Sequence, residues 1–273
     1  MIPFFEQFIF GLIQGVVEWL PFSSEGGLLL FYSTIHPQVD ISFFVRQSLF
    51  LHLGTFFAAL IYFRKDVKIL WKTFRHPQYA DRADKKVLNF IIIATIISGV
   101  LGLALLTYAN LALDTQKIVL SSKFVTFLVG FFLVITGIFQ IKSRRAGYRS
   151  VYHLNTNDAV LTGIAQGCAA LPGLSRSGLT VSTMLFRNID DATALKLSFL
   201  LSLPIVLIGN ILLNFWDFQF VGSMLWGLLF SFIFGLLTIH LLMRVAHKVK
   251  FGHFVLIVGI ITIISVFISL PFL

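Results

Sequence analysis

Long apolar runs dominate the chain, and the short segments between them carry most of the charge. Each run is close to or above the roughly 18–20 residues that a helix needs to cross the hydrocarbon core of a bilayer. The first is slightly short, but charged residues bound it on both sides. The pattern predicts six membrane-spanning helices, over residues 47–63, 87–107, 120–141, 197–216, 218–243 and 254–273.

Two further segments, residues 1–40 and 157–190, are apolar but interrupted by helix breakers. Pro21 divides the first, and Pro172-Gly173 divides the second. A helical piece of about ten residues reaches only about 15 Å, which is half of the hydrocarbon core. We therefore expect two re-entrant helix–loop–helix hairpins. The alternative, ordinary spans with proline kinks, requires more apolar length than the pieces have.

Composition agrees with a membrane protein. The chain is 57% hydrophobic and 12% charged, with a mean hydropathy of +0.90, whereas a soluble domain carries roughly a quarter charged residues. Cys168 is the single cysteine of the sequence, which excludes a disulfide framework or a cysteine metal cluster. The fold class expected is an all-α integral membrane protein.

The net charge of +9 is concentrated between spans. Eight of the 21 Lys and Arg residues fall in 64–86, four in 142–149 and three in 244–250. This is the positive-inside pattern, which places these connecting loops in the cytoplasm and argues against nucleic acid as a partner. With these loops in the cytoplasm, the six spans can alternate across the membrane only if each interrupted segment begins and ends on the same side of it. The first segment then begins and ends outside, and the second begins and ends in the cytoplasm.

The interrupted segments share a motif. Gln14-Gly15 aligns with Gln166-Gly167, and after a one-residue gap Pro21 aligns with Pro172, Ser24 with Ser175 and Gly27 with Gly178. Each half of the single membrane domain 1–273 then holds one hairpin and three spans, in residues 1–150 and 151–273. An odd number of spans makes the two halves inverted repeats. Paired broken helices of this kind point to a binding site at the repeat interface.

The tip of the second hairpin has the chemistry of an anion site. Ser175-Arg176-Ser177-Gly178 begins a half-helix, where free N–H groups and the positive end of the helix dipole meet a serine cap. Arg176 adds a permanent, five-donor cation suited to phosphate, and Thr180 adds a hydroxyl one turn on. The alternative role of Arg176 is that of a structural partner for Glu18.

The first tip offers oxygen ligands. Gln14 and Glu18 are four residues apart and share one helix face, with Ser23, Ser24 and Glu25 following the proline. A carboxylate and an amide oxygen suit a hard divalent cation, Mg²⁺ or Ca²⁺. Two oxygens make an incomplete site, which water and substrate phosphate would complete.

These residues carry a resemblance to a known family. Gln14-Gly-Val-Val-Glu18-Trp-Leu-Pro-Phe-Ser-Ser24 and Leu171-Pro-Gly-Leu-Ser-Arg-Ser-Gly-Leu-Thr180 resemble the two signature motifs of the undecaprenyl-diphosphate phosphatase family of BacA type. The resemblance implies six spans and two re-entrant hairpins in an inverted repeat. It also implies hydrolysis of a C55 lipid diphosphate to the monophosphate, which recycles a lipid carrier for cell-envelope glycan synthesis. A divalent metal and a site reached from the outer leaflet of the cell membrane are further implications.

Carried over by position, the functional residues of the family fall on Gln14, Glu18, Ser24, Ser175, Arg176, Ser177 and Thr180. One does not carry over. Where many members have a histidine after the first serine pair, this chain has Gly27. His52, in the first span, and Glu25 are the candidate replacements for that base, although a lone histidine in a span more often has a structural role.

The expected reaction leaves its nucleophile open. Either Ser24 attacks the terminal phosphorus, or a metal-activated water does, while Arg176 and the serine-capped helix hold the phosphates. A rival function is a transporter that flips a prenyl phosphate without hydrolysis, because inverted repeats with broken helices are typical of transporters. A lipid-binding homologue without catalysis is a third alternative. The sequence leaves the oligomeric state open, a homodimer included.

Overall fold

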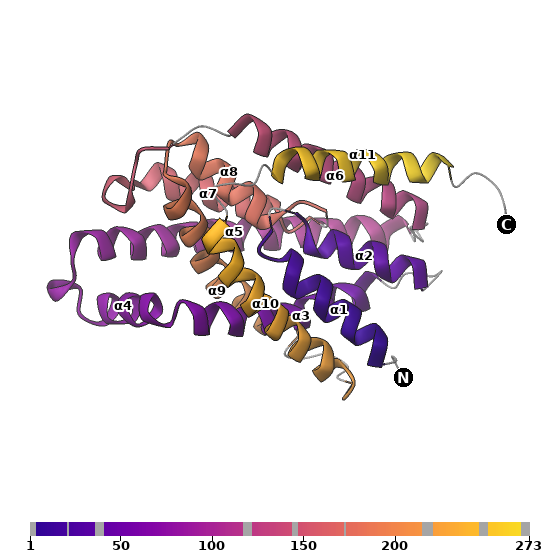
Figure 1. Cartoon of the computed structure of the whole chain (residues 1–273), viewed down its shortest axis with the longest axis horizontal. Coiled ribbons are helices and arrows are strands. Elements are labelled where there is room, and N and C mark those ends of the chain that lie inside the picture. The colour runs from indigo at the N-terminus through magenta and orange to yellow at the C-terminus, as the bar shows by residue number, and fades with distance from the viewer. Residues whose placement is uncertain are drawn as a thin grey trace.

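The protein is a bundle of helices in the computed structural model, which describes residues 4–20, 22–35, 41–116, 122–143, 147–171, 173–214, 221–245 and 251–268 (Figure 1). Among these residues, five helices are long and apolar enough to cross a membrane. They confirm the predicted all-α integral membrane class. Their bounds are Ile41–Tyr62 for α3, Arg82–Gln116 for α5, Ser122–Ser143 for α6, Asp191–Asn214 for α9 and Met224–Val245 for α10.

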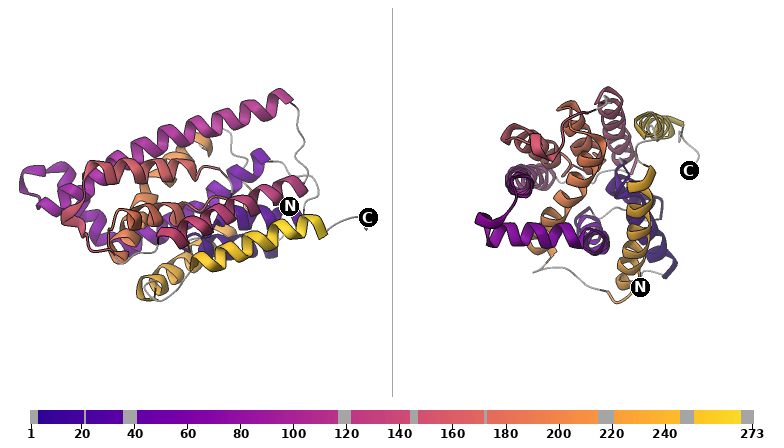
Figure 2. Two further views of the ribbon diagram at one scale, coloured as in Figure 1. Left: turned by 90° about the horizontal axis from the view of Figure 1, so that it is seen from above. Right: turned by 60° about the vertical axis from the view of Figure 1, so that its left-hand side comes forward.

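The sixth predicted span, 254–273, corresponds to α11, Phe251–Ile268. Its described part is apolar but shorter than the five others, and residues 269–273 lie outside the described ranges. In Figure 2, α11 runs beside α6, and these two helices pack along much of their length.

Both interrupted segments are pairs of short helices. The first pair is α1, Phe4–Val17, and α2, Ser24–Ile35, and the second is α7, Thr156–Cys168, and α8, Arg176–Phe186. With 11 to 14 residues each, they are about 17–21 Å long, well short of the roughly 30 Å hydrocarbon core. Pro21 and Pro172 lie outside the described residues. Gly173 has a φ of 101°, a left-handed conformation that glycine adopts without strain.

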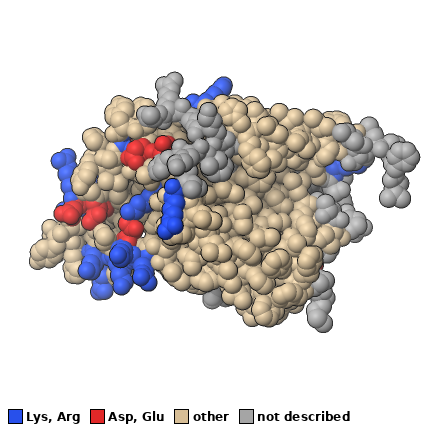
Figure 3. All heavy atoms as spheres, in the orientation of Figure 1, with Lys and Arg blue, Asp and Glu red and all other residues tan. Residues whose placement is uncertain are grey.

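The basic segment 64–86 is not the loop that the sequence led us to expect. It forms helix α4, Arg64–Arg75, then a 3₁₀ turn η1, Pro77–Tyr79, and the first turn of α5. The reason is an amphipathic pattern, in which Val67 and Leu70 pack on the core while the basic residues stay exposed. We call this the basic end of the molecule. Figure 3 shows its blue side chains gathered there, whereas most of the rest of that face is uncharged.

Corresponding elements of the two halves pack in matched pairs. Helix α1 lies along α10, and α7, its counterpart, lies along α5. The first spans of each half, α3 and α9, pack together, as do the last spans, α6 and α11. The division of the chain into two inverted repeats, with a boundary near residue 150, stays a prediction.

The main apolar core fills the half of the bundle nearer the basic end. It joins the last turns of α3 and α10 to the first turns of α5 and α9. Its fully buried members include Ala59, Ala94, Leu197, Leu201 and Ile239. The other half of the bundle holds the cavity described next.

Candidate functional site

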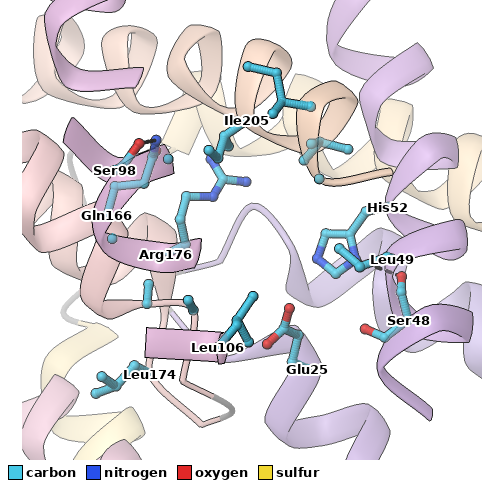
Figure 4. A pocket seen from close by; sticks show the side chains of 18 of the residues that line it. Glu25, Ser48, Leu49, His52, Ser98, Leu106, Gln166, Leu174, Arg176 and Ile205 are labelled. Carbon is cyan, nitrogen blue, oxygen red and sulfur yellow. Dashed lines mark hydrogen bonds between the residues drawn. The ribbon is translucent and has the colours of Figure 1, made fainter. Parts of the chain in front are cut away.

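The tips of the two hairpins meet at a cavity of about 470 Å³. Ser177, in the first turn of α8, donates a hydrogen bond from its hydroxyl to the Leu20 carbonyl at 2.7 Å, which ties one tip to the other. Residues of α3, α5, α7 and α9 complete the wall, as Figure 4 shows in part. The fold therefore places the two sequence motifs around one space.

Glu18 is the centre of the polar contacts in this cavity. Its Oε1 forms an ion pair with Arg176. Its Oε2 accepts hydrogen bonds from Ser24 Oγ at 2.8 Å and Gln14 Nε2 at 3.1 Å, and lies 3.2 Å from His52 Nε2. Only 6% of Glu18 is exposed. A buried carboxylate needs such partners, because desolvation without them is costly.

His52 makes two polar contacts through its ring nitrogens. Nδ1 lies 2.7 Å from the Ser48 carbonyl oxygen, which can only accept, so this nitrogen carries a hydrogen. Nε2 faces the Glu18 carboxylate, which also only accepts. Both contacts are favourable when both ring nitrogens carry hydrogens. An imidazolium fits this geometry, and in that form Nε2 carries a transferable proton.

Local structure at the start of α8 fixes Arg176. The Ser175 side chain caps the helix by accepting from the Gly178 N–H at 3.0 Å. Arg176 Nη1 donates to the Ser198 carbonyl at 3.1 Å, opposite the Nη2 contact with Glu18. Thr180 Oγ1 donates to the Arg176 carbonyl at 2.8 Å and lies 2.7 Å from Ser198 Oγ. Arg176 is thus held at the cavity wall with guanidinium N–H groups to spare.

Two of the predicted phosphate ligands are not on the cavity wall. Gly178 packs against Thr136 and Gln140 of α6, and the Thr180 hydroxyl bonds within the protein behind Arg176. Thr180 is therefore placed to position Arg176 rather than to contact a phosphate. Gln14 is not on the wall either, and the remaining predicted residues do line the cavity: Glu18, Ser23, Ser24, Glu25, His52, Ser175, Arg176 and Ser177.

The Gln14–Glu18 pair contacts other protein groups through most of its polar atoms, although Gln14 Oε1 is buried without a hydrogen-bond partner among the described residues. Gln14 directs its amide N–H, not its oxygen, at Glu18, and both carboxylate oxygens already contact cationic or N–H and O–H donors. Within the described ranges, no three His, Cys, Asp or Glu side chains are arranged to hold a metal ion. The requirement for Mg²⁺ or Ca²⁺ stays a prediction, and we assign no chemical step to a metal.

The imidazole at the site comes from His52 of α3, and not from the position in the first motif where many family members have a histidine. Gly27 is not on the cavity wall, and a Cβ added there would meet Ile13 and Phe22 at 3.4 and 3.8 Å. His52 comes instead from α3. Figure 4 shows His52 and Glu25 directed at the same space, and the Glu25 carboxylate makes no hydrogen bond among the described residues.

Sequence reasoning missed a second polar group on the wall. Gln166 Nε2 donates to Ser98 Oγ at 2.9 Å, and Arg176 lies between this pair and His52 (Figure 4). The repeat alignment of Gln166 with Gln14 gave a signal for one partner. Ser98 lies alone in an apolar span, and nothing in its sequence context pointed to the site.

Five helices that can cross a membrane, with an arginine, a carboxylate, an imidazole and a serine hydroxyl around one cavity between them, define the class: a polytopic membrane protein with a polar site among its helices. The model of the family described as "Bacitracin resistance protein BacA" matches residues 7–264, and the chain belongs to this family.

Proteins of similar sequence match this chain over nearly its whole length. The undecaprenyl-diphosphatase of Methanococcoides burtonii is 38% identical, covering 98% of this chain and 100% of the relative. That of Haloarcula marismortui is also 38% identical, with 92% and 93% covered. The Sulfurisphaera tokodaii protein of the same name is 33% identical, with 94% and 97% covered.

Proposed function

We propose that this protein hydrolyses a long-chain polyprenyl diphosphate, undecaprenyl diphosphate or a close analogue, to the monophosphate and inorganic phosphate. The observation that carries the proposal is the convergence of Ser24, Glu18 and Arg176 in one cavity between membrane helices. Relatives that share 33–38% of their residues over nearly the full chain are named for this activity. The product would return a lipid carrier to cell-envelope glycan synthesis.

Arg176 is the residue that receives the phosphates. When the diphosphate binds, its negative oxygens compete with Glu18 for the guanidinium, whose planar fork matches phosphate geometry. When the Arg176 guanidinium leaves Glu18 and binds the substrate phosphates, the Glu18 carboxylate is free to accept a proton. Substrate binding and activation of the base are thereby coupled.

Ser24 is the nucleophile that the geometry favours, because its hydroxyl already donates to Glu18 at 2.8 Å. The Ser24 oxygen attacks the terminal phosphorus, its proton passes to Glu18, and the bond from that phosphorus to the bridging oxygen breaks. Prenyl monophosphate leaves. Water then attacks the phosphoserine, Ser24 recovers a proton, and inorganic phosphate is released. The direct attack of water is the alternative route.

His52 supplies a second positive charge and a transferable proton next to Glu18. In the imidazolium form it stabilises the negative charge that develops on the phosphate oxygens. It can also protonate the departing monophosphate oxygen from Nε2. Glu25, directed at the same space, is a second proton acceptor for the attacking water.

The outer leaflet is the side from which we propose that the substrate enters. The cavity-lining residues of α3 lie between 44 and 52, those of α5 between 95 and 106, and those of α9 between 205 and 212. The α3 and α9 ranges lie in the half of each helix that is farther from the basic end, and the α5 range runs outward from the middle of that helix. The positive-inside rule places the basic end in the cytoplasm. The membrane is then the cell membrane, with the site facing outward.

This arrangement favours hydrolysis over transport. A flippase must open its site to both leaflets, but the half of the bundle between the cavity and the basic end is filled by the apolar core around Ala59, Ala94 and Leu201. The site residues are also those of a displacement reaction, with a hydroxyl hydrogen-bonded to a carboxylate beside an arginine.

Phosphate release from undecaprenyl diphosphate by purified protein in detergent tests the proposal. Wild type should turn over, and Ser24→Ala and Arg176→Lys should each lose at least about 100-fold in kcat, since each removes a transition-state contact. Ser265→Ala, on α11 and outside the cavity lining, is the matched control and should keep activity. Transfer of labelled lipid across a vesicle bilayer without phosphate release would contradict the proposal and favour transport.

A further inference from the structure

We propose that the prenyl tail leaves the polar site sideways, through a glycine-floored groove between the outer halves of α5 and α9. This assignment rests on the proposed function, because the groove is useful only to a lipid-linked substrate. It names the path of the tail and the residues that line it.

The cavity has a polar end and an apolar end. Arg176, Glu18, His52 and the Gln166–Ser98 pair surround the first. From Ser98 outward, the α5 residues on the wall are apolar, and those of α9 are apolar from Ile205 onward. A diphosphate with its charged head at Arg176 would therefore meet only apolar surface beyond Ser98.

Side chains at the apolar end face the cavity and the lipid at once. Val100 and Leu103 of α5 line the cavity and are 69% and 49% exposed, and Leu212 of α9 is 56% exposed. Residues that line a cavity and are this exposed stand at its mouth. The mouth therefore opens into the bilayer between α5 and α9, where a lipid substrate can enter without leaving the hydrocarbon.

Two glycines, which have no side chain, leave room along this path. A Cβ added to Gly99 would meet only Ile205 Cδ1, at 4.0 Å, and one added to Gly209 would meet only Leu49 Cδ2, at 3.8 Å. These glycines contrast with Gly11, Gly54 and Gly137, where a Cβ would come within 2.6 Å of a neighbouring helix. Helix packing thus does not require glycine at 99 or 209, and the space that they leave belongs to the cavity.

The inner end of the groove coincides with a helix irregularity. Pro204 lies inside α9, one residue before Ile205, and it cannot donate the backbone hydrogen bond that continues the helix. Before this proline, Leu197, Leu200 and Leu201 are buried in the core. After it, α9 contributes to the groove. The same helix therefore closes the site toward the basic end and opens it toward the lipid.

Substitutions that fill the groove should impair binding of the prenyl tail without affecting the polar site, so they test the two parts of the cavity separately. We would measure kcat/KM for undecaprenyl diphosphate and the inhibition constant of inorganic diphosphate, which occupies only the polar end, in Gly99→Leu and Gly209→Leu. We expect kcat/KM to fall at least tenfold in each variant while the inhibition constant changes less than twofold. Gly209→Ala should give a smaller loss, since one methyl group leaves most of the groove open.

Gly222→Leu is the matched control, because no atom lies within 4 Å of a Cβ there and Gly222 is outside the cavity. Its kcat/KM should equal that of wild type. If both groove variants keep kcat/KM within twofold, the tail leaves elsewhere and the assignment is overturned. Equal changes in kcat/KM and in the inhibition constant overturn it as well, since the glycines would then shape the polar site. Failure of wild type to release phosphate from undecaprenyl diphosphate would instead contradict the proposed function.

Discussion

At the residue scale, Glu18 connects the groups that the reaction needs. Arg176, His52, Ser24 and Gln14 all contact its carboxylate, so any one substitution alters the surroundings of the others. Effects of these substitutions should therefore be strongly non-additive, as for other groups that act as a unit. The activity lost in a single variant therefore reflects disruption of the whole group of residues, and it is not the contribution of one residue to the rate.

His52→Gln tests whether the ring carries a working proton. Glutamine can still donate to a carbonyl or a carboxylate, but it cannot transfer a proton, so kcat should fall about 100- to 10,000-fold with little change in KM. The rate–pH profile should lose one of its limbs in the same variant. Gly27→His should alter wild type little and should not rescue His52→Gln, because position 27 is off the cavity wall. Rescue would show that the motif position still reaches the substrate.

Removal of divalent cations tests the role predicted for Mg²⁺ or Ca²⁺. EDTA should abolish phosphate release, and either ion should restore it. Because Gln14 already donates to Glu18, we expect the ion to arrive with the diphosphate. Gln14→Ala should then shift the cation concentration for half-maximal activity less than twofold. A shift of tenfold or more would assign the ion to the Gln14–Glu18 pair after all.

At the scale of elements, the start of α7 is anchored by a buried ion cluster. Asp158 is fully buried and accepts from Arg149 at 2.6 Å and Arg187 at 2.8 Å, and it also completes a capping box with Asn155. This cluster joins both ends of the second hairpin to the segment before it. The hairpin tip that carries Arg176 therefore depends on contacts at its far end.

The stability of this cluster should depend on pH in a defined direction. Burial by itself would raise the pKa of Asp158, but hydrogen bonds from Arg149 and Arg187 outweigh it and hold the pKa below its usual value of 3.8. A lowered pKa in the folded state stabilises the protein above pH 3.8, and this contribution is lost as the pH falls further. Thermal unfolding in detergent between pH 3 and pH 7 would measure it.

Asp158→Asn removes the charge while keeping the shape, and leaves two arginines without their carboxylate. We expect a cost of about 3 kcal/mol, or a Tm lower by roughly 6–12 °C, and a weaker dependence on acid. Asp66→Asn is the control, since its ion pair with Lys196 is partly exposed and should contribute less than about 1 kcal/mol. Equal effects of the two substitutions would refute a special role for the buried cluster.

At the scale of the whole molecule, the topology predicts which surfaces face which side. In a Cys168→Ser background, a cysteine at Lys72, on exposed α4, should react with an impermeant thiol reagent only from the cytoplasm. A cysteine at Gly222, exposed before α10, should react only from outside. Labelling of both positions from the same side would contradict the assignment of the basic end to the cytoplasm.

The sequence by itself determined the class, the spans and the hairpins. Apolar runs, helix breakers and the placement of Lys and Arg are local properties, and bilayer thickness turns them into helix lengths and sides. The bounds of α6, α9 and α10 accordingly fall within six residues of the predictions, whereas α5 extends beyond its predicted span at both ends, by five and nine residues. The basic segment is the exception. Its charge concealed an amphipathic helix, α4, which is stable because Val67 and Leu70 reach the core.

Only the tertiary structure decided which side chains share the cavity. His52, Ser98 and Gly209 lie on three different spans, and their proximity to the hairpin tips follows from how α3, α5 and α9 pack together. The sequence also did not predict that Gln14 directs its amide N–H at Glu18 or that the Thr180 side chain lies away from the cavity. Motif spacing fixes which residues share a helix face, but contacts between distant helices arise from packing, which a single sequence does not record.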